Sequence, residues 1–162
     1  MRPVEFHLHS HWRVQAGIDE VFEVISEPLH FVRWWPAVYL EVEEIEPGDG
    51  DGVGRTLNLH TRGLLPYTLH WRATATEVNK PMRLVVEARG DLEGTGEWNL
   101  HQDGEWTEVD YDWKVFANKP WMRYLAPLLR PVFAANHHWA MNKGRQGLAQ
   151  ELRRVRDGQS AT

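Results

Sequence analysis

Cysteine is absent from this sequence of 162 residues. Its absence excludes disulfides, thiolate metal sites and a cysteine nucleophile. Long apolar runs are missing too: the chain never approaches about 18 consecutive apolar residues, and its first residues lack the apolar stretch of a signal peptide. We therefore expect no integral membrane segment and predict a cytoplasmic protein.

An excess of positive charge is also missing. The 18 Lys and Arg residues are outnumbered by 23 Asp and Glu residues, which gives a net charge of −5. A general nucleic-acid binder needs a basic excess to neutralise phosphates. We therefore expect no nucleic-acid partner.

Motifs of several enzyme classes are missing as well. The sequence contains no G-x-S-x-G nucleophile elbow, no P-loop and no dinucleotide-binding fingerprint. The run Gly94-Thr95-Gly96 precedes a predicted strand instead of a helix, so it does not form a phosphate cradle. The carboxylates of Glu97, Glu108, Asp110 and Asp112 are predicted on an outer sheet face, which disfavours a paired-carboxylate glycosidase. No cofactor is predicted.

Tryptophan, by contrast, is abundant, with nine residues in all. Large aromatic side chains either fill a core or line a ligand pocket, and composition does not decide between the two. The length suits a single domain, and no internal repeat or linker divides it. We predict one domain over residues 1–157, followed by a short polar tail over residues 158–162.

The C-terminal stretch from about Pro120 to Arg156 predicts the longest helix. Pro131 suits the first turn of a helix of about 25 residues, whereas Pro120 and Pro127 confine any earlier helix to a short, kinked lead-in. Such a helix needs a partner surface to bury its apolar side. At helical spacing that side consists of His137, Met141, Gly144, Leu148, Leu152 and Val155.

Most of the chain before that helix predicts β-structure. Glu5 to Val14 alternates apolar and polar residues, as a half-buried strand does. Two short helices follow, Ile18 to Ile25 and His30 to Trp35, the second ending at Pro36. Six further strands are separated by short turns: Val38 to Ile45, Gly54 to Arg62, Tyr67 to Val78, Met82 to Arg89, Thr95 to His101 and Thr107 to Ala117. The prediction is an α+β fold in which a curved antiparallel sheet of about seven strands wraps around the long helix.

A cavity between sheet and helix is predicted from side-chain size. The middle of the inner sheet face is rich in Tyr and Trp, where a solid core would more typically use Val, Ile and Leu. Gly144 and Gly147 allow the C-terminal half of the helix to approach the sheet closely. If the N-terminal half of the helix lies farther from the sheet, a cavity remains under the stretch Phe133 to Met141.

This order of elements resembles the helix-grip fold of the START-like, polyketide cyclase/dehydrase superfamily (SRPBCC), which includes the birch-pollen allergen fold. The resemblance covers essentially the whole chain. The segments that carry it are Trp12-Arg13-Val14 with Val21-Phe22, Trp34-Trp35-Pro36, Gly52-Val53-Gly54, Leu65-Pro66-Tyr67, Gly94 to Trp98, Tyr111-Asp112-Trp113, and Asn136-His137-His138 with Met141, Gly144 and Gly147-Leu148. The superfamily implies lipid carriers, cyclases, hydrolases or ligand sensors on one scaffold, without a shared catalytic motif.

His137 is the best catalytic candidate, because it lies on the apolar side of the helix and faces the predicted cavity. It suits a general acid–base, or a hydrogen-bond donor to a carbonyl-bearing ligand. The alternative is a core histidine paired with a neighbouring Tyr or a backbone carbonyl. Likewise Trp34-Trp35 forms either part of a cavity entrance or a structural plug.

Aromatic side chains dominate the predicted ligand-binding residues. Tyr67, Trp71, Tyr111 and Trp113 form a cross-strand set that suits a ring-containing ligand and a plain core equally well. The full predicted set is Trp35, Leu59, Tyr67, Trp71, Trp98, Tyr111, Trp113, Phe133, Asn136, His137 and Met141.

His7, His9 and His11 point the same way from the first strand. Together with His60 and His70 they raise the alternative of a Zn²⁺ or Ni²⁺ site. Metal sites need ligands that converge in a concave place, however, and this face is predicted to be convex and solvated. We predict no metal site.

The predicted function is therefore the binding of a hydrophobic small molecule, lipid-like, aromatic or polyketide-type, by a monomer or homodimer. The alternative is a cyclase or dehydratase in which His137 and a pocket tyrosine transfer protons. A third class is an interaction domain, whose mark would be an exposed apolar patch.

Overall fold

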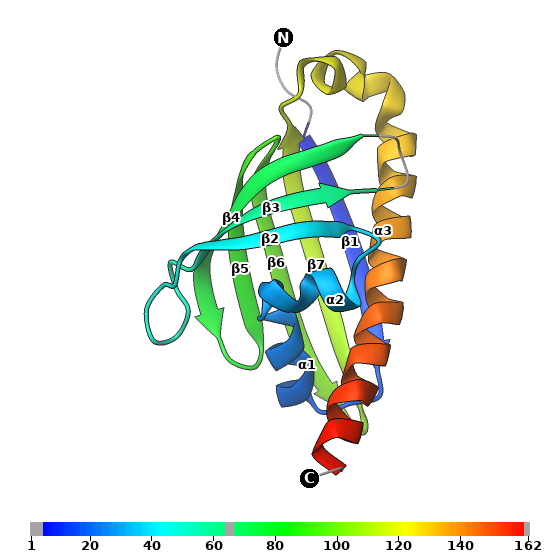
Figure 1. Ribbon diagram of the computed structural model, residues 1–162. Helices are drawn as coiled ribbons and strands as arrows, with labels where there is room; N and C mark the ends of the chain where they lie inside the picture. Colours follow the sequence, from blue (N-terminus) through cyan, green and yellow to red (C-terminus); the bar gives the residue numbers. More distant parts are fainter. Residues whose placement is uncertain (1–4, 64–66, 161–162) are drawn as a thin grey trace.

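The computed structural model describes residues 5–63 and 67–160, which form one curved sheet closed by helices (Figure 1). Strand β1 (Glu5–Val14) leads to α1 (Ile18–Ile25), the 3₁₀ helix η1 (Pro28–His30) and α2 (Phe31–Trp34). The next six elements are β2 (Tyr39–Glu46), β3 (Thr56–Arg62), β4 (Thr68–Asn79), β5 (Arg83–Gly90), β6 (Leu92–Asp103) and β7 (Trp106–Ala117). Helix α3 (Pro120–Ser160) ends the described chain.

All seven strands belong to one antiparallel sheet with the order β1-β7-β6-β5-β4-β3-β2. Consecutive strands from β2 to β7 are neighbours because each connection is a hairpin. The first strand then pairs with the last, from Glu5 opposite Phe116 to Val14 opposite Thr107. The predicted helix-grip architecture is confirmed, including both short helical segments after the first strand.

Helix α3 differs from its predicted form. It is one helix of 41 residues with Pro127 and Pro131 inside it, not a lead-in followed by a separate helix that begins at Pro131. An internal proline removes one backbone hydrogen bond and pushes against the preceding turn, which bends a helix without necessarily ending it. Figure 1 shows this bend near the start of α3. The helix also continues to Ser160, past the predicted start of the polar tail.

Two glycines allow the C-terminal half of α3 to pack closely against its neighbours. A Cβ at Gly144 would lie 2.5 Å from the ring of Trp35 and 3.0 Å from that of Trp12, and a Cβ at Gly147 would overlap the carbonyl oxygen of Trp34. The close approach predicted here therefore exists, but most of it is to α2. The tight seating forms a core in which Trp12, Trp34 and Trp35 pack with Leu148.

A second core lies at the other end of the sheet, where Phe6, Trp113 and Val115 pack against Met122 and Phe133 of α3. The ring of Phe6 meets that of Phe133 edge-on at 5.4 Å. In the described part of the chain, no helix is both long and apolar enough to cross a membrane. The two cores leave open space between them, on the inner side of the sheet.

Candidate functional site

Two cavities that share a wall lie on the inner side of the sheet. The larger, which we call the wide cavity, has a volume of about 750 Å³, and the smaller, the narrow cavity, about 150 Å³. Tyr39, Trp71, Trp98 and Tyr111 line both, and we call them the junction residues. The volume suits a small molecule of several rings or a short lipid-like chain.

The wide cavity lies beside the short helices. Its inner wall is apolar, because strands β3 to β5 present alternate residues inward: Leu57, Leu59, Ala73, Ala75, Leu84 and Val86. Val24, Ile25, Phe31 and Trp34 close it from the helical side. Its outer rim is charged and runs from α1 and η1 to the β2–β3 connection and the C-terminal turns of α3. An apolar interior behind a charged rim is typical of a pocket open to solvent on one side.

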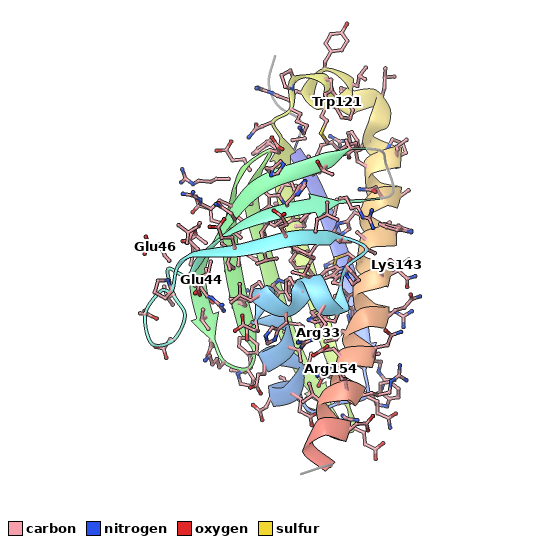
Figure 2. The ribbon with its side chains drawn as sticks, in the orientation of Figure 1. Arg33, Glu44, Glu46, Trp121, Lys143 and Arg154 are labelled. Carbon is pink, nitrogen blue, oxygen red and sulfur yellow. The ribbon has the colours of Figure 1, made fainter. Side chains whose placement is uncertain are left out.

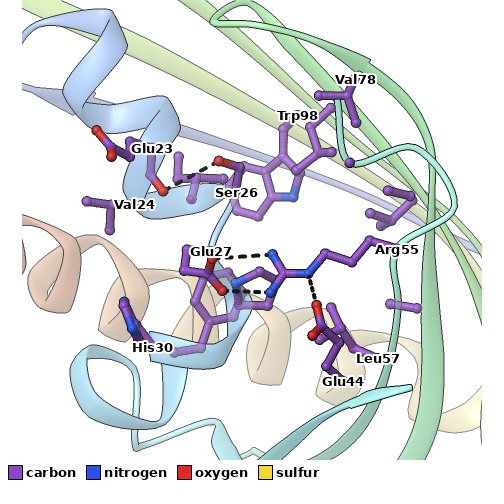
Figure 3. Close-up of a pocket in the computed structure, with 18 of the residues that line it drawn as sticks. Glu23, Val24, Ser26, Glu27, His30, Glu44, Arg55, Leu57, Val78 and Trp98 are labelled. Atoms are coloured by element: carbon purple, nitrogen blue, oxygen red, sulfur yellow. Dashed lines mark hydrogen bonds and ion pairs between the residues drawn. The ribbon is translucent and has the colours of Figure 1, made fainter. Parts of the chain in front are cut away.

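Arg55 spans this rim (Figure 3). Its Nε donates to Glu44 of β2 at 2.7 Å, and its two terminal nitrogens donate to the carboxylate of Glu27, at 2.9 and 3.4 Å. Glu27 also caps η1 by accepting a hydrogen bond from the backbone N–H of Leu29. The guanidinium therefore joins the short helices to the sheet across the cavity opening.

Glu151 of α3 holds the rim on its other side. The carboxylate is 4% exposed and accepts hydrogen bonds from Arg33 of α2 and from Arg154, the latter at 2.8 Å. Burial by itself would raise the pKa of Glu151, but the two arginines outweigh it and lower the pKa to about 2. Figure 2 shows Arg33 and Arg154 approaching one another from the two helices. This triad ties α2 to α3.

The narrow cavity lies under the N-terminal half of α3, where side-chain size predicted a cavity. Its walls carry Phe6, Leu8, Tyr67, Leu69, Trp113, Phe133, Asn136, His137, Ala140 and Met141. Most of the open volume, however, lies beside α1, η1 and α2, a location that was not predicted. The reason is geometric: the short helices cover only part of the curved sheet, and strands β2 to β5 extend beyond α3.

His137 borders the narrow cavity in an uncharged form. Its Nε2 shares a hydrogen bond of 3.1 Å with the hydroxyl of Ser10 on β1, and its ring lies parallel to that of Tyr111, with centroids 6.4 Å apart. Burial, together with the neighbouring His138, lowers the pKa of His137 to about 4. The side chain is therefore neutral near pH 7. The hydrogen bond to Ser10 holds its ring in place.

Tyr39 and Tyr111 bring two phenol hydroxyls to the junction. Both side chains lie deep in the protein yet keep accessible surface, because they border the cavities. Burial raises the pKa values of Tyr39 and Tyr111 well above that of an ordinary tyrosine, so both hydroxyls remain protonated. Neither makes a hydrogen bond to another described residue. The junction thus offers two free O–H donors inside an aromatic wall.

Aromatic rings surround these hydroxyls. Trp98 stacks on Tyr111 at 4.1 Å between centroids, and Tyr111 in turn stacks on Trp113 at 5.8 Å. The indole N–H of Trp71 donates to the hydroxyl of Thr61 at 3.0 Å, so this ring is held by a partner of its own. Such an arrangement suits a flat apolar ligand whose oxygen accepts a hydrogen bond.

The eleven predicted ligand-binding residues all lie on the walls of the two cavities. Leu59 lines the wide cavity; Trp71, Trp98 and Tyr111 line both; and the narrow cavity has the rest, namely Trp35, Tyr67, Trp113, Phe133, Asn136, His137 and Met141. Their contact with a ligand stays a prediction. Trp34 and Trp35 are buried, and Trp35 donates its indole N–H to the carbonyl of Ala140 at 2.9 Å, which fits the predicted plug better than an entrance.

Sequence reasoning missed Tyr39 and the rim ion pairs. Simple alternation along β2 puts Val38, Leu40 and Val42 on one face, which excludes Tyr39. The strand is irregular between Tyr39 and Glu41, and this irregularity lets both Tyr39 and Val42 turn inward. The partners of Arg55 come from distant points in the chain, so no local spacing marks them.

The outer histidines form a ladder with carboxylates instead of a metal centre. His9 Nδ1 bonds Asp112 at 2.9 Å, and His11 Nδ1 bonds Asp110 at 2.9 Å, across the β1–β7 pair. His60 and His70 stack on each other at 4.0 Å, but on β3 and β4, far across the sheet from β1. Among the described residues, no three His, Asp or Glu side chains are arranged to hold a metal ion.

Solved structures with this fold include proteins of different activities. An aromatase/cyclase, Zhui, from Streptomyces sp. R1128 has a TM-score of 0.73 at 18% identity, covering 93% of this chain and 95% of its own. A START superfamily protein from Mycobacterium smegmatis has a TM-score of 0.74 at 12% identity, covering 92% and 98%. Norcoclaurine synthase from Thalictrum flavum, in complex with dopamine and hydroxybenzaldehyde, has a TM-score of 0.58 at 19% identity, covering 92% and 88%.

These identities establish a shared fold and nothing finer. A search of the curated proteins finds no match. A family model does match residues 6–155, which is nearly the whole chain and includes every element that lines the cavities. The chain therefore belongs to the family described as polyketide cyclase / dehydrase and lipid transport.

Proposed function

We propose that this protein binds a hydrophobic small molecule with at least one ring and a carbonyl or hydroxyl oxygen, held between sheet and helices. The observation that carries the proposal is the pair of hydroxyls of Tyr39 and Tyr111, which face the junction without a partner among the described residues. A donor in an aromatic wall that has no protein partner is available to a ligand oxygen.

The apolar walls support the same proposal. The ligand body would lie in the wide cavity against Leu59, Ala73 and Trp98, whose side chains are largely apolar. Its oxygen would reach the junction. The family description and the activities of the similar structures, an aromatase/cyclase among them, agree with a ligand of this class.

A matched pair of probes tests the proposal. Menadione has two ring carbonyls, and 2-methylnaphthalene has nearly the same shape without them; the absence of Cys removes the thiol reaction that would complicate the use of a quinone. We expect the wild type to bind menadione more tightly, measured by quenching of Trp fluorescence. Tyr39→Phe with Tyr111→Phe should lower the affinity for menadione about thirtyfold, since each of the two lost hydrogen bonds is worth about 1 kcal/mol.

The hydrocarbon is the control. Its affinity should be the same in the wild type and in the double variant, because it accepts no hydrogen bond. If both probes lose affinity equally, the tyrosines act through packing and the proposed oxygen recognition is wrong. If neither probe binds the wild type, the binding function itself is contradicted.

A second candidate is proton transfer in a cyclase or dehydratase, and the position of His137 favours it. The ring is oriented by Ser10 and lies beside Tyr111, as a base and a donor at one substrate carbonyl would. With a pKa of about 4, His137 is a weak base, which makes this the second choice. His137→Phe should abolish turnover of a poly-β-ketone and leave its binding intact; unchanged turnover would exclude the role.

A further inference from the structure

An exposed apolar stripe lies on the first turns of α3. It consists of Trp121, Tyr124, Leu128 and Val132, which are 41%, 71%, 79% and 40% exposed. Their spacing of three or four residues places them on one side of the helix. Single exposed apolar residues are ordinary, whereas four along one helix face form a contiguous patch that marks an interaction site. These turns form the end of the molecule opposite the C-terminus (Figures 1 and 2).

The charge around this stripe is unlike that of the rest of the protein. Between Asp112 and Glu151 the sequence contains no acidic residue. It does contain six cations: Lys114, Lys119, Arg123, Arg130, Lys143 and Arg145. Because the whole chain has a net charge of −5, the remainder has a net charge of −11. The stripe therefore belongs to a long basic segment of an acidic protein.

Two of these cations lie in the same turns of α3 without a counter-charge. Arg123 and Arg130 make no ion pair with any described residue, and the guanidinium of Arg130 lies 5.8 Å from the ring centre of Phe6. Lys119 has a partner, Asp91, at 3.6 Å. The seven-residue spacing of the two arginines puts them on one side of the helix, away from the side that carries the stripe. These turns therefore combine an apolar side with a side that carries unpaired cations, which suits an anionic surface.

The opposite side of the same turns faces the narrow cavity. Met122 and Phe133 are buried there, on the cavity wall. Tyr67, another wall residue, packs edge-on against Trp121 at 5.3 Å. One short helical segment thus separates the narrow cavity from the exposed stripe.

We propose that the first turns of α3 dock on an anionic lipid surface, with Trp121, Tyr124, Leu128 and Val132 in the headgroup region and Arg123 and Arg130 on lipid phosphates. Helices that lie in a membrane interface combine an apolar side that includes Trp with Lys and Arg on the polar side. Trp and Tyr rings favour the headgroup level. A stable protein partner fits less well, because about 20 residues a side form such an interface and the stripe has four.

Flotation with lipid vesicles tests the docking directly. The probes are vesicles of phosphatidylcholine alone and vesicles of phosphatidylcholine and phosphatidylglycerol in equal parts. We expect the wild type to bind the mixed vesicles, and less tightly as salt is raised. Tyr124→Ser with Leu128→Ser should weaken binding by about tenfold or more, since both side chains leave water on docking.

A matched surface variant separates this stripe from apolar exposure in general. Met82 is 50% exposed on the β4–β5 connection, outside the basic segment, so Met82→Ser should bind the mixed vesicles like the wild type. Arg123→Gln with Arg130→Gln should remove most of the preference for phosphatidylglycerol, about thirtyfold for two charges. All these positions are exposed or half-buried, and unchanged thermal unfolding would verify that each variant is folded.

Three results would overturn the docking proposal. The wild type would fail to bind mixed vesicles, or the serine variant would bind them as well as Met82→Ser does. Alternatively, the wild type would be a dimer that the serine variant converts to a monomer, without vesicle binding, and the stripe would then be a contact between copies of the chain. The inference does not depend on the ligand of the cavities, so a failed menadione titration would leave it standing.

Discussion

The wide and narrow cavities share four residues but are held together in different ways. Charged pairs around Arg55 and Glu151 fix the rim of the wide cavity. Neutral groups fix the narrow cavity: His137 bonds Ser10, and stacked aromatic rings fill the space around them. Under the proposed function, the wide cavity would admit the ligand and hold its body, whereas the narrow cavity and the junction would orient it.

The largest loss of stability is expected at the packing contact between α3 and α2, on which both cavities depend. Gly147→Ala should lower the free energy of unfolding by about 3 kcal/mol, since the new Cβ overlaps the carbonyl oxygen of Trp34 and the backbone must shift. Urea denaturation measures the loss. In the same helix, a Cβ at Gly158 would meet no atom within 4 Å, so Gly158→Ala should be neutral or stabilising. Equal effects of the two substitutions would show that this contact is not tight.

A smaller effect is expected at the rim of the wide cavity. Glu151→Gln should lower the free energy of unfolding by about 2 kcal/mol, because it removes the negative charge that Arg33 and Arg154 share. Both arginines are partly exposed, which keeps the loss below that of a fully buried pair. The exposed pair Glu20–Arg156 gives the control, and Glu20→Gln should cost less than about 0.5 kcal/mol.

The loss of stability in acid can be tested with the same two variants, Glu151→Gln and Glu20→Gln. Since the pKa of Glu151 is lowered from 4.5 to about 2 on folding, its contribution is complete above pH 4.5 and is lost as the pH falls toward 2. Urea titrations of the wild type over this range should show the loss, and Glu151→Gln should show a smaller one, because Asp112 also has a lowered pKa in the folded protein. A variant that keeps the full slope would show that other carboxylates control the acid response.

The narrow cavity should respond to pH in a different window. The pKa of His137 falls from 6.5 to about 4 on folding, so the unfolded chain binds a proton between these values and the folded chain does not. Stability should therefore fall by about 1 kcal/mol or slightly more as the pH drops from 6.5 to 4, after allowance for the partial exposure of the ring. His137→Phe should flatten this part of the curve, and His30→Phe, at an exposed histidine, serves as the control. An unchanged slope in His137→Phe would contradict the buried, neutral state.

Regular alternation made the sheet predictable. Strands such as β1 and β7 carry apolar residues at every second position, and short Gly- and Pro-containing turns join the hairpins, so the order of the strands from β2 to β7 follows from the sequence alone. The position of His137 on the apolar side of α3 was predictable for the same reason. The period of the apolar pattern indicates which residues share a face of a strand or helix, and it did so correctly along most of this chain.

Features that depend on irregularity or on distant pairing were not predictable. The irregular start of β2 turns Tyr39 inward against the simple pattern, and Pro127 and Pro131 bend α3 where a break was expected. The larger volume lies beside α1 and η1 because short helices cover a wide, curved sheet incompletely. How much of the sheet the helices cover depends on the shape of the whole domain, and no local pattern of residues predicts it.

Ligand binding in the cavities is tested most directly by native mass spectrometry of gently purified protein, with identification of any molecule released on denaturation. We expect a stoichiometric hydrophobic compound that carries a ring and a carbonyl or hydroxyl oxygen. A protein that carries nothing, and whose thermal stability is unchanged by menadione, by 2-methylnaphthalene and by a panel of fatty acids and aromatic polyketides, would contradict the proposed function.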